Sequence, residues 1–171
     1  MGDVTRLGIL TDPVSIRPVT GSDAELLRAL AAACPPLDVH TPYTYWVLTR
    51  MFPGSCFIAF SGDTPVGFVT SVVADGKAFL WQVGVLPAAR GRGLSAALIN
   101  AVSDHARTSG ITAVETTVAP GNAASLAAFR SYAAGNGLVF DQVGSMVVRD
   151  VTDLSFVEAE TIFVLREAAV C

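Results

Sequence analysis

The hydrophobic and polar residues of this chain follow two periods, and each change of period marks the border of an expected element. Apolar residues recur at helical spacing from Leu94 to His105, which predicts one face of an amphipathic helix that ends near Ser109. Shorter runs that alternate or are rich in β-branched residues are typical of strands. They predict strands at residues 15–19, 56–60, 65–73, 78–86, 111–118, 138–143 and 161–165, with a further helix at 123–134.

The first helix is expected directly after the first strand. Ser22 and Glu25 have the spacing of a capping box, which predicts Ser22 as the N-cap, and Pro35 and Pro36 end the helix. The three strands between residues 56 and 86 are joined by short turns, so they predict an antiparallel meander. Because the sequence shows neither an internal repeat nor a linker, we expect a flexible leader at 1–14 and a single domain at 15–171.

The loop between the strand that Pro87 ends and the long helix favours phosphate binding. The first-turn amides of a helix have no acceptor within the helix and carry partial positive charge. Gly91 and Gly93 allow the backbone to approach an anion, and Arg90 and Arg92 add positive charge. We expect a diphosphate-bearing ligand at residues 90–95. The alternative is a tight turn with two solvated arginines.

Composition narrows the classes of partner. The 171 residues are 51% hydrophobic and 15% charged, which suits a globular domain, and no apolar run is long enough to span a bilayer. The net charge of −4 argues against nucleic acid and is compatible with a cationic substrate. The start of the chain lacks the apolar stretch of a signal peptide, so we expect a cytoplasmic protein. Three cysteines and two histidines form no metal-ligand pattern, and we expect no metal.

Residues 35–46 gather prolines, aromatic residues and one carboxylate in a short segment. Prolines reduce the entropy that a segment loses when it becomes ordered. Asp38, Tyr43 and Tyr45 would suit a compact ammonium group, through ion pairing and attraction to the ring faces. The alternative is that the aromatic residues form the core face of a helix at 42–52 and that Asp38 is a capping or solvated residue.

Arg90, Gly93 and Ser95 fit a pattern of Arg or Gln, two residues of any type, Gly, one more residue, and a small residue. This pattern resembles the acetyl-CoA pyrophosphate loop of the GNAT N-acetyltransferase superfamily. Asn122, with Ser125 three residues later, resembles the segment of that superfamily that contacts the pantetheine arm. The cofactor-binding residues that the resemblance implies are Val83, Gly84, Val85, Arg90, Gly91, Arg92, Gly93, Leu94, Ser95, Asn122, Ser125 and Phe129.

The order of the expected elements also resembles this superfamily over nearly the whole chain. The resemblance implies an α/β fold with a mixed central sheet flanked by helices, acetyl-CoA as cosubstrate, and a fourth and fifth strand that part. Backbone groups near Val83 and Val85 would then pair with pantetheine amides, as an added strand would.

Three segments, at 34–45, 81–85 and 115–125, are similar to diaminobutyrate acetyltransferases, which acetylate the 4-amino group of L-2,4-diaminobutyrate in ectoine synthesis. This narrower resemblance implies a homodimer and an amino-acid pocket lined by Asp38, Tyr43 and Trp81. The full set of substrate-binding residues expected is Asp38, Thr41, Tyr43, Tyr45, Trp81 and Glu160.

The chain departs from this family at three positions. The family usually has Asn where this chain has His40, and it tends to carry His and Glu at the positions of Val157 and Glu160. The tyrosine that many GNAT enzymes use as a general acid falls at Phe129. Another small diamine or amino acid therefore stays open as the substrate, and a non-catalytic acyl-CoA-binding module is the alternative of a different class.

The chemistry of amine acetylation indicates which residues would catalyse it. An alkyl ammonium has a pKa of about 10, so it must lose a proton before it attacks a thioester. Glu115 is the expected base, with an outward-facing surface charge as its alternative reading. A backbone N–H near Val83 would stabilise the oxyanion. Tyr43, or less favourably Tyr132, would protonate the departing thiolate in a direct transfer within a ternary complex.

Overall fold

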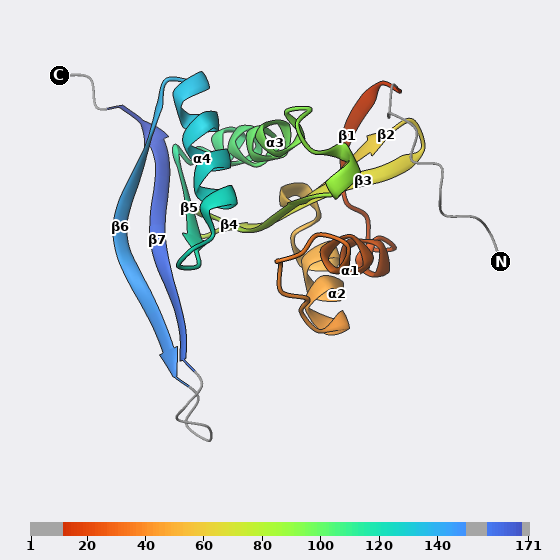
Figure 1. Cartoon of the computed structure of the whole chain (residues 1–171), viewed down its shortest axis with the longest axis horizontal. Helices are drawn as coiled ribbons and strands as arrows, with labels where there is room; N and C mark the ends of the chain where they lie inside the picture. The colour runs from red at the N-terminus through yellow and green to blue at the C-terminus, as the bar shows by residue number, and fades with distance from the viewer. Residues whose placement is uncertain (1–11, 150–156, 169–171) are drawn as a thin grey trace.

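The computed structural model describes residues 12–149 and 157–168, which form one seven-stranded sheet with helices on both faces (Figure 1). The strands are β1 (Val14–Pro18), β2 (Phe57–Ser61), β3 (Thr64–Ala74), β4 (Lys77–Val85), β5 (Ala113–Val118), β6 (Leu138–Arg149) and β7 (Val157–Glu167). The helices are α1 (Ala24–Ala32), α2 (Pro42–Met51), α3 (Leu94–Thr108) and α4 (Ala123–Gly135), with 3₁₀ turns η1 (Pro53–Ser55) and η2 (Pro87–Ala89). No helix of these two ranges has the length and apolar content that crossing a membrane requires.

The expected α/β fold with a mixed sheet is confirmed. The strand order is β1-β2-β3-β4-β5-β7-β6, and β4 with β5 is a parallel pair whereas the other neighbours are antiparallel. Residues 1–11 of the expected leader lie outside the described residues. Val14, which the leader was expected to include, is paired with Ser61 as the first residue of β1.

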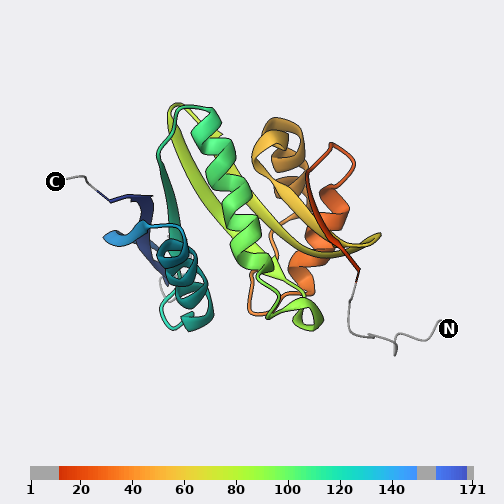
Figure 2. The same ribbon diagram turned by 90° about the horizontal axis from the view of Figure 1, so that it is seen from above.

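The helices divide between the two faces of the sheet. Figure 1 shows α3 and α4 on one side and α1 and α2 on the other, and Figure 2 shows α3 lying along the central strands with α4 beside it. Two apolar clusters follow this division: one joins α3 and α4 to the sheet, and the other joins α1 and α2 to it. Each helix thus buries its apolar stripe against a β-branched strand surface.

β4 and β5 part after three residue pairs. Their register runs from Ala78 with Val114 to Leu80 with Thr116, and at the last pair the Thr116 hydroxyl donates to the Leu80 carbonyl at 3.0 Å. β4 then continues to Val85, paired with β3 on its other edge. The edge of β4 that faces β5 is therefore open beyond Leu80, as the resemblance implied.

We call the place beyond Leu80 where β4 and β5 part the fork, and a β-bulge in β4 lies there. Thr70 is paired with Gln82 and Ser71 with Leu80, so Trp81 is the extra residue on β4. A bulge changes which side chains face which side of a sheet. Ala78 and Leu80 pack in the α3 cluster before it, whereas after it Gln82 bonds to residues of the α1–α2 layer.

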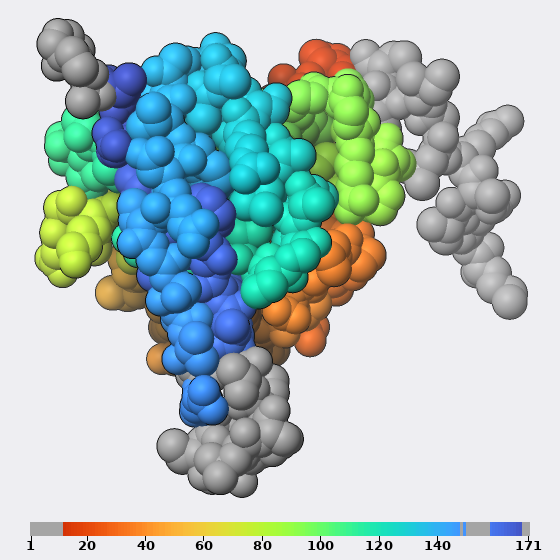
Figure 3. All heavy atoms as spheres, turned by 60° about the vertical axis from the view of Figure 1, so that its left-hand side comes forward, coloured from red at the N-terminus to blue at the C-terminus, as the bar shows by residue number. Residues whose placement is uncertain are grey.

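β6 and β7 form a long hairpin, which stands forward as a ridge beside α4 in Figure 3. The predicted strands at 138–143 and 161–165 cover only the part of this hairpin that packs on the core. There Phe140 stacks between Phe129 and Phe163, with ring centroids 5.3 and 4.5 Å apart. The remainder continues to Arg149 and back from Val157 with exposed and half-buried residues, so its apolar residues do not mark a core face.

The predicted capping box at Ser22 is wrong. α1 has Asp23 as its N-cap residue, without a side-chain capping bond, because the Asp23 carboxylate binds elsewhere. It accepts two hydrogen bonds from Arg17 of β1, at 2.8 and 3.0 Å, and two from Thr20. This cluster ties the first strand to the first helix.

Candidate active site

Two cavities open at the fork between β4 and β5, and they share part of their lining. The first, the carboxylate cavity, has a volume of about 440 Å³ and contains the side chains of Asp38, Glu115, Glu158 and Glu160. The second, the loop cavity, has a volume of about 300 Å³ and contains Arg90 and Ser95. The residues common to both are Pro36, Leu37, Val83, Asn122 and Ser125. A ligand that extends from one cavity to the other would pass along the open edge of β4.

The loop before α3 has the geometry expected of an anion site. Gly91 and Gly93 adopt positive φ angles of 76° and 74°, a region that side chains other than glycine rarely occupy. A Cβ at either position would meet no heavy atom within 4 Å, so the space above the loop is open. Leu94 begins α3 with its side chain buried in the core, and it contributes only its amide to the loop. Acetyl-CoA diphosphate fits this arrangement of free first-turn amides.

The two arginines of the loop differ in their contacts. Arg90 lines the loop cavity, where its Nε donates to the Val85 carbonyl at 3.1 Å and its Nη2 to the Pro35 carbonyl at 3.4 Å. Arg92 donates instead toward Ser61 and the Asp12 carbonyl, at 3.5 and 3.4 Å. Arg90 therefore links the loop to both β4 and the segment after α1, whereas Arg92 lies toward β1 and β2.

The start of α4 forms the opposite wall of the two cavities. The Asn122 side chain caps the helix, since its Oδ1 accepts the Ser125 amide hydrogen at 3.1 Å. Both residues line both cavities, as expected for a segment that contacts pantetheine. Phe129 lines the carboxylate cavity from the same helix and is 2% exposed. It supplies an apolar surface without an ionisable group.

The carboxylate cavity is acidic. Its four carboxylates come from the segment after α1, from β5 and from β7, and none of the described residues that line it is Lys or Arg. Glu158 and Glu160 lie on the same face of β7, because side chains of a strand alternate with a period of two. Four nearby acidic groups favour a ligand with more positive than negative charges.

Aromatic side chains complete this cavity. The ring centroids of His40 and Trp81 lie 5.1 Å apart, and both residues line the cavity. Trp81 is 40% exposed, because the bulge directs it out of the packed sheet beside the open edge. An indole face next to carboxylates is a good surface for an ammonium group.

Three residues expected to bind substrate do not line the carboxylate cavity. Thr41 is the N-cap of α2, and its hydroxyl accepts the Thr44 amide hydrogen at 3.3 Å. Tyr45 is fully buried beneath the cavity and bonds to Gln82. Tyr43 is 70% exposed and stacks on Trp46 with ring centroids 5.7 Å apart. The helix at 42–52 that was the alternative reading of this segment is α2.

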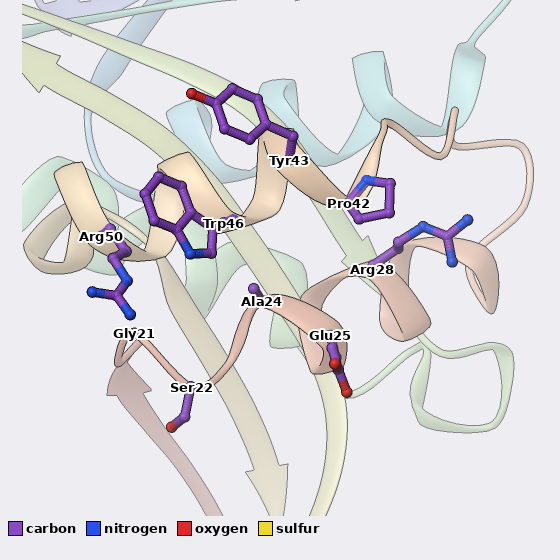
Figure 4. A pocket seen from close by; sticks show the side chains of 9 residues that line it. All are labelled: Gly21, Ser22, Ala24, Glu25, Arg28, Pro42, Tyr43, Trp46 and Arg50. Carbon is purple, nitrogen blue, oxygen red and sulfur yellow. The ribbon is translucent and has the colours of Figure 1, made fainter.

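Tyr43 lies instead in a separate groove on the outer side of α1 and α2. Figure 4 shows Trp46 beside Arg50 in this groove, with Glu25 and Arg28 of α1 opposite. The groove has a volume of about 900 Å³, but among the described residues its one carboxylate, Glu25, is accompanied by Arg28 and Arg50, and no strand residue lines it. Tyr132, the weaker candidate for proton donor, is also away from the fork, where its hydroxyl donates to Asn100 Oδ1 at 3.2 Å.

Cys34 lines the loop cavity just after α1, a position that the sequence analysis did not assign to the site. Burial raises the pKa of this thiol, more than the nearby Arg90 lowers it. A thiol with a raised pKa is a weak nucleophile at neutral pH. In the described ranges, no group of three or more His, Cys, Asp or Glu residues is arranged to hold a metal ion.

Glu158 and Gln82 are among the cavity residues that the sequence analysis did not single out. Glu158 lies two residues before Glu160 and therefore on the same face of the strand, and this alternation is the signal that would have found it. Gln82 is 6% exposed and lines the cavity, but its place depends on the bulge at Trp81. A bulge of this kind leaves no mark in a single sequence.

Comparison with known proteins agrees with this geometry. Residues 24–133 match the acetyltransferase (GNAT) family. An L-2,4-diaminobutyric acid acetyltransferase of Halomonas elongata is 37% identical over 131 residues, which cover 74% of this chain and 68% of that protein. A Nocardia farcinica protein of the same name is 38% identical over 123 residues, but the match spans only 63% of its length and 70% of this chain.

The structural comparison covers more of the molecule. Diaminobutyrate acetyltransferase EctA from Paenibacillus lautus, solved with L-2,4-diaminobutyric acid and coenzyme A, superposes with a TM-score of 0.78 and 25% identity. The superposition covers 94% of this chain and 99% of that one. The ribosomal-protein-S18-alanine N-acetyltransferase of Escherichia coli, at 16% identity and a TM-score of 0.72, shares the fold. This chain therefore belongs to the GNAT acetyltransferase family and, within it, to the group of the L-2,4-diaminobutyric acid acetyltransferases.

Proposed function

We propose that this protein transfers the acetyl group of acetyl-CoA to the 4-amino group of L-2,4-diaminobutyrate, the reaction of ectoine synthesis. The observation that carries the proposal is the carboxylate cavity, which lies at the fork and continues into the loop cavity. At neutral pH diaminobutyrate has two ammonium groups and one carboxylate, so four acidic side chains match its excess of positive charge. The L-2,4-diaminobutyric acid acetyltransferases that this chain resembles, and the solved structure that contains this substrate, support the same amine.

Acetyl-CoA would occupy the loop cavity and the open edge of β4. The diphosphate would lie on the amides of residues 91–95, where Gly91 and Gly93 leave space for it. Pantetheine would then extend between Val83 of β4 and Asn122 of α4, which line both cavities. This path directs the thioester toward the carboxylates.

Glu115 would accept the proton of the attacking ammonium. It is an exposed residue of β5, and it lines the carboxylate cavity beside the fork. A carboxylate that water can reach is able to pass the proton on to solvent, directly or through a bound water molecule. The amide hydrogen near Val83 would stabilise the oxyanion of the tetrahedral intermediate.

The transfer would be direct, without an acetylated cysteine. Among the residues that the structure describes, Cys34 is the cysteine that lines the loop cavity. Burial raises the pKa of its thiol and so keeps it protonated. Tyr43 and Tyr132 lie away from the cavity, and Phe129 cannot donate a proton. We therefore propose that water, rather than Tyr43, protonates the departing thiolate, which is a good leaving group because thiols have pKa values of about 8.5.

Another small diamine is the second candidate substrate. His40 favours it, because this residue lines the carboxylate cavity at a position where the family usually has Asn. Steady-state release of the CoA thiol, measured with a panel of amines, separates the candidates. We expect diaminobutyrate to give the highest kcat/KM. A severalfold preference for ornithine, lysine or a polyamine would contradict the substrate, and binding of acetyl-CoA without thiol release from any amine would indicate a non-catalytic acyl-CoA-binding module.

We also propose that the enzyme is a cytoplasmic homodimer that needs no nucleic-acid partner. β6 is one of the two edge strands of the sheet and exposes Val143 and Val147, which a second copy could cover. The net charge of −4 supports a small cationic partner, and the buried thiols of Cys34 and Cys56 suit a reducing compartment. Light scattering should give twice the chain mass of 17.8 kDa, and the mass of a single chain would contradict the dimer.

A further inference from the structure

The segment Asp38–His40 forms a wall of the carboxylate cavity but belongs to neither a helix nor a strand. Its backbone groups therefore lack the partners that a helix or a strand supplies. Side chains from elsewhere in the fold provide them. The Asp38 carbonyl accepts a hydrogen bond from Gln82 Nε2 at 2.7 Å, and the His40 amide donates to the Tyr45 hydroxyl at 3.4 Å.

Gln82 and Tyr45 are themselves bonded to each other. The Tyr45 hydroxyl donates to Gln82 Oε1 at 3.3 Å. Burial raises the pKa of this hydroxyl, so it stays protonated and able to donate. The bonds form a closed ring that runs from His40 through Tyr45 and Gln82 to Asp38 and returns along two peptide units. The ring fixes both ends of the segment to the sheet.

The bulge in β4 makes this arrangement possible. Because Trp81 is the extra residue, Trp81 and Gln82 both lie on the side where the segment packs. Trp81 meets the His40 ring at 5.1 Å, and Gln82 donates to the Asp38 carbonyl two residues before it. Two consecutive residues of one strand thus contact the same segment.

We propose that Gln82, supported by Tyr45, is a positioning residue that holds Asp38 and His40 at the amine-binding cavity. The inference rests on the proposed function for the identity of the amine, but not for the geometry of the segment. Gln82 acts through the segment, since its amide is occupied by Asp38 and Tyr45 and is 6% exposed. Glutamine is suited to this place because its amide donates in one direction and accepts in the other.

Kinetics of the Gln82→Leu, Gln82→Glu and Tyr45→Phe variants test the proposal. With the best amine of the wild type, KM should rise about tenfold in Gln82→Leu, while kcat and the acetyl-CoA affinity stay within about twofold. Gln82→Glu separates positioning from direct contact with the substrate. The variant keeps the acceptor for Tyr45 but loses the donor for Asp38, so we expect a raised amine KM. If residue 82 contacted the ammonium group directly, the added negative charge would lower the amine KM instead.

Tryptophan fluorescence gives a readout that does not depend on activity. The chain has two tryptophans, so Trp46→Phe leaves Trp81 as the single emitter beside His40. In this background Gln82→Leu should increase the quenching of Trp81 by acrylamide and shift its emission, because the segment no longer covers it. The quenching measurement does not depend on which amine the enzyme uses, so it distinguishes failure of the inference from failure of the proposed function.

Thr49→Val is the matched control. Thr49 is a buried residue of α2 whose hydroxyl donates to the Tyr45 and Trp46 carbonyls, and it makes no bond to the segment. It should lower the melting temperature without changing the amine KM or the Trp81 quenching. If Gln82→Leu does not fold, the volume-conserving Tyr45→Phe takes its place. A folded Gln82→Leu or Tyr45→Phe variant that keeps the wild-type KM or the wild-type quenching overturns the proposal.

Discussion

Gly93 contributes to the proposed cofactor site through its backbone. Its φ of 74° turns the chain from the loop into α3 and leaves the first-turn amides of that helix directed at open space. Asp38, by contrast, contributes a charge from a segment whose backbone Gln82 holds in place. One substitution at each residue therefore separates cofactor binding from amine binding.

Gly93→Val should weaken acetyl-CoA binding by at least about tenfold, because hydrogen bonds to a charged group contribute about 1.5–3 kcal/mol each. The valine would strain the loop and occupy the space above it. Calorimetric titration with CoA measures the effect. Gly76→Val is the matched control, since Gly76 has the same φ of 74° and equally open surroundings in the turn between β3 and β4. If both variants lose the same affinity, the loop is not the binding site.

Asp38→Asn should raise the amine KM about tenfold and leave the acetyl-CoA affinity unchanged, because the substitution removes a charge-assisted bond to the ammonium. The backbone contact with Gln82 does not involve the side chain, so the segment keeps its position. Asp63→Asn, in the turn between β2 and β3, makes the same change of charge at an exposed site away from the fork. An unchanged amine KM in Asp38→Asn would assign this residue a structural or solvated role.

At the scale of elements, an ion pair between Arg17 and Asp23 joins β1 to α1. The sequence pattern predicted a capping box at Ser22 instead. The Arg17 guanidinium, through its hydrogen bonds to Asp23, lowers the pKa of that carboxyl from 3.8 to about 2. A carboxylate whose pKa is lower in the folded state stabilises the fold above the pKa of the unfolded chain. This stabilisation is lost as the pH falls from about 4 toward about 2.

Asp23→Asn should therefore reduce the free energy of unfolding by about 2 kcal/mol or less at pH 7, because a shift of one pKa unit corresponds to about 1.4 kcal/mol and Arg17 is partly screened by water. The side chain of Arg17 is 42% exposed and that of Asp23 is 10% exposed. Urea denaturation between pH 7 and pH 2 measures the difference. The difference in the free energy of unfolding between the wild type and Asp23→Asn should disappear at low pH. A difference that stays constant with pH would show that the ion pair is not its cause.

Gly84 positions the segment after α1 against β4. A Cβ at this residue would lie 2.7 Å from Phe68 and 2.8 Å from Leu37, closer than real contacts allow. Gly84→Ala should cost about 1–3 kcal/mol in the free energy of unfolding, as overpacked cores do. It should also raise the amine KM, because Leu37 adjoins Asp38. Gly144→Ala in β6, whose nearest neighbour would be Ile162 at 3.7 Å, is the control and should be near neutral.

The sequence predicted elements best where local patterns decide the structure. The loop at 90–95, the helix that follows it and the meander before it need only periodicity, glycine and proline to be found. The place of Gln82 depends on the bulge at Trp81, which local patterns do not contain, whereas Glu158 follows from its alternation with Glu160. Tyr43 was assigned to the site by resemblance, yet helical geometry places it on the outer side of α2 with Trp46.

At the scale of the whole molecule, the sheet places the proposed cofactor loop and an acidic cavity at the two ends of one open strand edge. β4 parts from β5 after Leu80, α4 covers the fork from one side, and the segment after α1 covers it from the other. No single element contains the proposed site. The fold therefore explains how residues as distant in sequence as Asp38 and Glu160 line one cavity.

A crystal structure of the complex with CoA and L-2,4-diaminobutyrate tests this account most directly. We predict that the diphosphate accepts hydrogen bonds from the amides of residues 91–95 and that pantetheine lies along Val83–Val85. The 4-amino group should then lie among the carboxylates of the fork, near Glu115. Density for CoA away from this loop, or diaminobutyrate bound in the groove of Tyr43 and Trp46, would contradict the account.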